Sequence, residues 1–231
     1  MSIVTLNDRA VRSVTTFGSL NTGSMVFINK ITASSSATID FTSGIDSTYK
    51  EYVFTFKDIH PQTDAASLVF QADTGTNTNY NQTMTTTMFR SYHSEDGSQS
   101  GLDYITTSGE DQAQGTSFQK LIHGSAIGND NDQSGVGILQ VFNPSSTTFV
   151  KHFISETGSM FANARAWHNF VAGYCNTNGE EVSSIIGTVG SDGIKSSKSI
   201  KLTGLRDGGG EAHNARIYWS YQIAVSGTCV I

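Results

Sequence analysis

Apolar and polar residues alternate along much of the chain with a period of two. Residues 51–71, EYVFTFKDIHPQTDAASLVFQ, show this most clearly, on both sides of a turn at His60–Pro61. The apolar positions are Tyr52, Phe54 and Phe56 before the turn and Leu68 and Phe70 after it. Alternation of this kind is typical of strands with one buried face. We therefore expect a half-buried antiparallel pair here, with the first strand lining the core of a sandwich and the turn as its corner.

Short strands of the same kind are predicted from Ser24 onward. The segments are 24–32, 37–43, 84–93, 135–143, 147–155, 168–175, 183–189, 198–205 and 215–225. The short link Pro144–Ser146 predicts a hairpin between two of them. A short helix is expected only at 160–170. Polar, glycine-rich segments separate the strands and no crossover helices recur, so the fold expected is an all-β, antiparallel, jelly-roll-like β-sandwich over residues 24–231.

The two ends of the chain differ from this pattern. Residues 1–23 hold only short apolar patches, and they suit either an extended arm that anchors the chain on a larger assembly or a loosely ordered terminus. Segment 215–225 is apolar and aromatic on both faces, which favours a subunit contact over simple core packing for its second face. The interface candidates are Val11, Val14, Phe17, Tyr218, Trp219 and Tyr221.

Charge and composition exclude several classes of protein. Only 15% of the 231 residues are charged, the net charge is −6, and the 14 Lys and Arg residues form no cluster, which argues against a nucleic-acid partner. No apolar run approaches the length of a transmembrane helix, so membrane insertion is not expected. The first residues lack the pattern of a secretory signal.

Residues 129–135, NDNDQSG, match the start of a calcium-binding loop at Asp130, Asp132 and Ser134. Such a loop closes with a bidentate glutamate at its twelfth position, and that position here is Val141. An ordinary turn before a strand therefore explains the segment better than a hard-cation site. The six histidines form no HxH or HExxH motif, so no other metal site and no cofactor are expected.

No pattern of catalytic residues is apparent. The adjacent carboxylates Glu95–Asp96, Glu110–Asp111 and Glu180–Glu181 lie in polar segments and are expected to be solvated loop charges. Neither a GxSxG nor a GxxxxGK[ST] motif is present. Cys175 and Cys229 are expected to be free thiols, with Cys175 buried as a small apolar residue. The chain is therefore predicted not to be an enzyme.

Three segments resemble a group of virion structural proteins of tailed phages that infect marine bacteria, including cyanobacteria. They are SSSATIDFTSGIDSTYKEYVFTFKDIHPQTDAASLVFQ, GNDNDQSGVGILQVFNPSSTTFVKHFIS and SIKLTGL. The resemblance extends from about Ser24 to Leu205. The group often carries a KLYG ending, where this chain has Thr203, and the chain then continues through residues 206–231. These proteins are usually described as tail-fibre-like, and the resemblance brings no functional residues with it.

The resemblance implies a virion protein, made in the host cytoplasm, that is a tail fibre or appendage and contributes to host attachment. Its expected partners are other copies of itself in a homotrimer, other virion proteins and a host surface glycan. A capsid decoration protein that clamps the head is the nearest alternative. A glycan-binding or glycan-degrading virion protein is a further one, although no pair of acids is spaced for hydrolysis.

Overall fold

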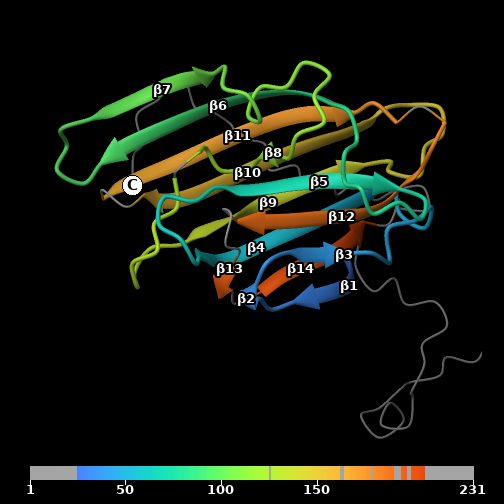
Figure 1. Cartoon of the computed structure of the whole chain (residues 1–231), viewed down its shortest axis with the longest axis horizontal. Helices are drawn as coiled ribbons and strands as arrows, with labels where there is room; N and C mark the ends of the chain where they lie inside the picture. Colours follow the sequence, from blue (N-terminus) through green and yellow to red (C-terminus); the bar gives the residue numbers. More distant parts are fainter. Residues whose placement is uncertain are drawn as a thin grey trace, which may run out of the picture.

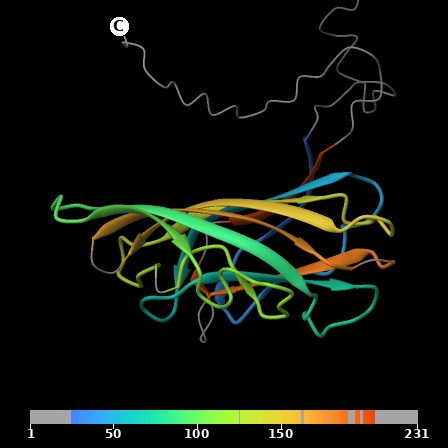
Figure 2. The same ribbon diagram turned by 90° about the horizontal axis from the view of Figure 1, so that it is seen from above.

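A computed structural model describes residues 25–124, 126–161, 164–177, 179–189, 194–196 and 199–205. In these residues the protein is all-β, with no helix, and its strands form two antiparallel sheets. The ten-stranded sheet runs in the order β1-β14-β4-β9-β10-β11-β6-β7, with β13 and β2 attached beside β4. The four-stranded sheet runs β3-β12-β5-β8 and lies against it as a second layer (Figures 1 and 2). The β-sandwich predicted from the sequence is confirmed.

The strands of the larger sheet, in chain order, are β1 (Met25–Ile31), β2 (Ser34–Ser36), β4 (Glu51–Pro61), β6 (Met84–Ser94), β7 (Ser100–Ile105), β9 (Gly135–Phe142), β10 (Lys151–Phe161), β11 (Arg165–Cys175), β13 (Ile194–Ser196) and β14 (Ser199–Leu205). Those of the smaller sheet are β3 (Ile39–Phe41), β5 (Leu68–Thr74), β8 (Gln119–Lys120) and β12 (Val182–Val189).

Aromatic side chains join the two layers at the centre of the core. Phe54 of β4 meets Phe41 of β3 edge to face, with ring centroids 5.3 Å apart. Phe153 of β10 meets Phe70 of β5 in the same way, at 4.9 Å. All four rings are buried. Edge-to-face pairs add to the free energy gained by burying the rings, so these contacts fix how the sheets pack.

β4 and β5 do not form the antiparallel pair that the sequence predicted. β4 pairs with β14 and β9 in the larger sheet, whereas β5 pairs with β12 and β8 in the smaller one. The pairing of β4 with β9 shifts between Phe56 and Ile59, and Asp58 between them has a φ of 49°. A bulge bends a strand, and this one lies just before the chain crosses to the other sheet. The turn predicted at His60–Pro61 is wrong, because both residues belong to β4 and pair with β13. The chain crosses to the other layer in residues 62–67 instead.

The other strand predictions are largely confirmed. The hairpin predicted around Pro144 is the antiparallel pair β9–β10. The helix predicted at 160–170 is wrong, because β10 runs to Phe161 and β11 begins at Arg165, and the two pair along their whole length. Buried Trp167, Asn169 and Val171 alternate with outward residues, which is the period of a strand.

Several features lie beyond the prediction or beyond the described residues. Strand β7 was missed because Ser100–Ile105 follows a polar, glycine-containing turn, yet it pairs with β6 from Met88 to His93. The strand order shows a sandwich without establishing a jelly roll. The predicted arm at residues 1–23 and the predicted strand at 215–225 lie outside the described residues.

Removing one ring of the inter-sheet contact should destabilise the fold strongly. We expect Phe70→Ala to lower the free energy of unfolding by about 3–5 kcal/mol, because it leaves a cavity beside Phe153. The control is Phe149→Ala, whose ring is 67% exposed, with an expected change of about 0.5 kcal/mol or less. Urea denaturation followed by fluorescence measures both; equal losses would contradict this account of the core.

Candidate interaction surface

The outward face of the larger sheet is not covered by any other described part of the chain. Side chains alternate across a sheet, so every second residue of β6, β7, β9, β10 and β11 points away from the smaller sheet. Large apolar side chains occupy many of these positions and are exposed: Phe89 43%, Leu102 72%, Tyr104 59%, Val136 45% and Ile154 50%. In Figure 2 the larger sheet forms the upper of the two layers, with this face uppermost. We call the outward positions of these five strands the outer face.

Three aromatic residues lie side by side across the outer face. Tyr104 of β7 is opposite Phe89 of β6, and Phe89 is opposite Phe170 of β11. The rings of Phe89 and Phe170 stack with centroids 4.7 Å apart and planes 14° apart. Direct cross-strand neighbours of this kind hold each other in place. Tyr104, Phe89 and Phe170 thus form a fixed aromatic ridge.

The outer face carries almost no formal charge. Glu156 of β10 is the only Asp, Glu, Lys or Arg at the outward positions of the five strands. Its Oε1 lies 2.8 Å from Nε2 of His168 on β11. By contrast, the neighbouring outward positions of β4, β14 and β1 include Lys57, Lys201 and Lys30. Charge depletion at the centre distinguishes protein interfaces from ordinary surface.

A hollow opens at one end of the outer face, beside the ridge. Its volume is about 430 Å³, and its lining comes from β6, β9, β10, β11 and the residues next to them. Small outward residues, Gly158 and Ala166, form its floor, and Val136 and Met160 border it. Gly158 and His168 are cross-strand partners, so the hollow lies one row of side chains from the ridge.

The opposite, inner face of β6, β11 and the end of β10 is covered mainly by the segment 106–124, in which only Gln119–Lys120 (β8) is a strand. Buried polar side chains of the sheet bind its backbone: Thr157 Oγ1 donates to the carbonyl of Leu121 at 2.7 Å, and Asn169 Oδ1 accepts from the amide of His123 at 3.3 Å. The backbone amide of Thr86 donates to the carbonyl of Gln112. Irregular backbone needs such partners when it is buried, which accounts for polar residues at inward positions of β6, β10 and β11.

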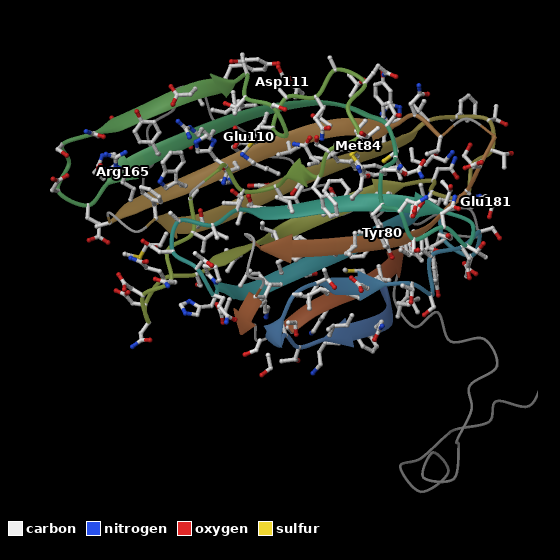
Figure 3. The ribbon with its side chains drawn as sticks, in the orientation of Figure 1. Tyr80, Met84, Glu110, Asp111, Arg165 and Glu181 are labelled. Atoms are coloured by element: carbon white, nitrogen blue, oxygen red, sulfur yellow. The ribbon has the colours of Figure 1, made fainter. Side chains whose placement is uncertain are left out.

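Glu110 is the centre of this segment, and the expectation that it is a solvated loop charge is wrong. Its side chain is fully buried, whereas its neighbour Asp111 is half-exposed at the margin of the molecule (Figure 3). Glu110 Oε1 accepts a hydrogen bond from the amide of Gly124 at 2.6 Å and lies 3.2 Å from Lys120 Nζ and 3.1 Å from His123 Nδ1. Both ends of the segment are therefore tied to one carboxylate.

These contacts determine the acidity of Glu110. Burial by itself would raise the pKa of this carboxyl, but His123, the amide of Gly124 and the charge of Lys120 together outweigh burial and lower the pKa to about 2. The group is therefore ionised in the folded protein at neutral pH. It acts as a structural anion that holds the segment closed.

Aromatic stacking attaches the same segment to the sheet. The ring of His123 stacks on Trp167 of β11 at 5.2 Å, with planes 13° apart. The guanidinium of Arg90 lies 4.2 Å from the centroid of the Trp167 ring and also pairs with Asp103 of β7 at 3.3 Å. A cation over an indole face is attractive. The inner face here is thus filled by stacked rings and ion pairs from the sheet and the segment.

The residues singled out by sequence are not brought together into a site. Asp130 and Asp132 lie in an exposed turn closed by a hydrogen bond from the amide of Gln133 to the carbonyl of Asp130 at 3.0 Å, and Ser134 follows it. In the part of the chain that the structure describes, no three His, Cys, Asp or Glu side chains are placed to hold a metal ion. The interface candidates Val11, Val14, Phe17, Tyr218, Trp219 and Tyr221 all lie outside the described residues.

Cys175 is a free, buried thiol at the end of β11, and Cys229 lies outside the described residues. Burial raises the pKa of the Cys175 thiol to about 12, although the charge of Lys151 acts in the opposite direction. A thiol with so high a pKa is not a nucleophile at neutral pH. Cys175 therefore packs as a small apolar residue, as the sequence indicated.

The outer face itself was missed by the sequence analysis, although the sequence holds a signal for it. In β11 the inward residues Val171 and Cys175 alternate with Phe170, Ala172 and Tyr174. When both alternating sets of side chains in a strand are apolar, the strand is typically covered on both of its faces. One face is buried in this structure, and the other is the exposed outer face.

Comparison with protein-family models, curated proteins and solved structures finds no match to this chain. Among the described residues, no helix is long and apolar enough to cross a membrane.

Replacing the buried anion should destabilise the protein in a pH-dependent way. We expect Glu110→Gln to lower the free energy of unfolding at pH 7 by about 2 kcal/mol, somewhat less than the fall in pKa implies, because Lys120 and His123 are partly solvated. The folded-state pKa lies below the unfolded value, so this stabilisation is complete above about pH 4.5 and is lost as the pH falls toward 2.

Urea denaturation between pH 7 and pH 2 measures this difference, with the neighbouring Asp111→Asn as the matched control. The wild type and Glu110→Gln should converge in stability at the acid end, while Asp111→Asn should stay close to the wild type throughout. A Glu110→Gln variant as stable as the wild type at pH 7 would contradict the role of the anion.

Proposed function

We propose that this chain is a non-enzymatic structural component of a tailed-phage particle, a tail-fibre or appendage protein that assembles with copies of itself and contributes to host attachment. The exposed apolar outer face is the observation that carries the assembly part of this proposal. Soluble monomers rarely expose a contiguous apolar patch of this extent, and such patches are typical of protein contacts. The phage context comes from the resemblance of residues 24–205.

The pairing of the first and last described strands supports a single attachment point. Met25 of β1 is opposite Leu205 of β14, so the described part of the chain begins and ends at the same end of the same edge. The loops at the other end of the strands, such as the turn between β6 and β7, are then free to face away from that point (Figure 1). A module tethered at one end and free at the other is the arrangement that an appendage needs.

Purified particles test this proposal directly. Immunogold labelling with antibody raised against the purified protein should mark the tail or its appendages, and mass spectrometry of the same particles should detect the chain. Gold distributed over the head would instead support a capsid decoration protein. Particles that lack the chain altogether would overturn the proposal.

Deletion of residues 1–23 should abolish incorporation, because this segment is the expected anchor. The measurement is the amount of the chain per particle after complementation with the truncated gene, compared with complementation by the full-length gene. Soluble, folded protein at normal abundance in the lysate shows that the truncation did not act through misfolding. Normal incorporation of the truncated chain would mean that the anchor lies elsewhere.

A further inference from the structure

We infer that the outer face is a self-association surface, through which two copies of this chain pack face to face about a two-fold axis. The inference deepens the proposed function and rests on its assembly part, because it names the surface and the partner. It differs from the trimer expected from the sequence, since a two-fold contact closes with two copies.

The extent of the outer face suits a stable dimer. Strands β6, β10 and β11 have 11 residues each, β9 has 8 and β7 has 6. At about 3.3 Å per residue and about 4.8 Å between strands, they span a face on the order of 750 Å². A standard protein interface buries about 800 Å² on each partner. The face is therefore large enough without any help from the charged positions on β4, β14 and β1.

The charge of the outer face favours a second copy over an unrelated partner. In a two-fold contact the same surface meets itself, so unpaired charges near the axis would face like charges. At the outward positions of the five strands this problem is avoided, because their one carboxylate, Glu156, is already paired with His168 on the same copy. A second carboxylate, Glu95, lines the hollow just beyond the end of β6, at the margin of the face. A nearly neutral face can therefore meet its own copy without like-charge repulsion.

The shape of the outer face is also complementary to itself. The aromatic ridge projects beside the hollow, and one row of side chains, about 7 Å along the strands, separates them. A two-fold axis that lies in the interface between the two features would seat the ridge of each copy in the hollow of the other. Gly158 leaves room there, since a Cβ on it would meet nothing closer than 3.7 Å.

Sedimentation velocity on the full-length protein and three variants tests the inference. Ile154→Lys places a charge at the centre of the outer face, and Ala166→Trp fills the hollow without changing charge. Phe149→Lys is the matched control, because its ring is as exposed as these positions but lies in the turn before β10, off the outer face. All three side chains are on the surface, and circular dichroism checks that each variant remains folded.

The wild type should sediment at twice the chain mass of 24.8 kDa at micromolar concentration. Ile154→Lys and Ala166→Trp should each raise the dimer dissociation constant about ten-fold or more, and Phe149→Lys should leave it unchanged. A wild-type monomer throughout the micromolar range would overturn both the inference and the assembly part of the proposed function. An oligomer, including a trimer, that is insensitive to Ile154→Lys and Ala166→Trp would overturn the inference alone.

Discussion

The ten-stranded sheet is much wider than the four-stranded sheet that packs on it, so strands alone cannot close its inner face. Over β4, β9 and β10 the gap is filled by rings such as Phe54 and Phe70, which meet partners on the other layer. Over β11 and β6 it is filled by the segment 106–124, whose backbone needs polar partners. The unequal width therefore explains why buried polar side chains accompany the apolar core over β6 and β11.

Glu110 holds the segment 106–124 in place over β6 and β11. An irregular segment placed over a sheet would expose its own backbone to a dry interior unless it were held in one conformation. The carboxylate ties the amide of Gly124 and the side chains of Lys120 and His123 to one point, and His123 then stacks on Trp167. The same strands that receive this segment on one side present the outer face on the other, so β6, β10 and β11 contribute both to the core and to the proposed interface.

The sequence predicted what depends on local alternation and failed where distant partners decide. The buried face of β4, with Tyr52, Phe54 and Phe56, follows from a period of two and was predicted correctly. That period cannot say which sheet a strand joins, so β5 was wrongly paired with β4. Burial of Glu110 depends on residues 10 and 13–14 positions away, in a segment that looks like any polar loop. The outer face could not be predicted, because the sequence does not show which side of each strand the second sheet covers. An apolar residue on the uncovered side therefore looks the same as a core residue.

We propose that the outer face is the contact surface, because it carries large exposed apolar side chains and almost no formal charge. Cryo-electron microscopy of the intact phage particle tests this central claim most directly. The account predicts density for this sandwich on the particle, with the outer face of one copy packed against that of a second copy. A map in which the sandwich is present but the outer face is bare to solvent would contradict it.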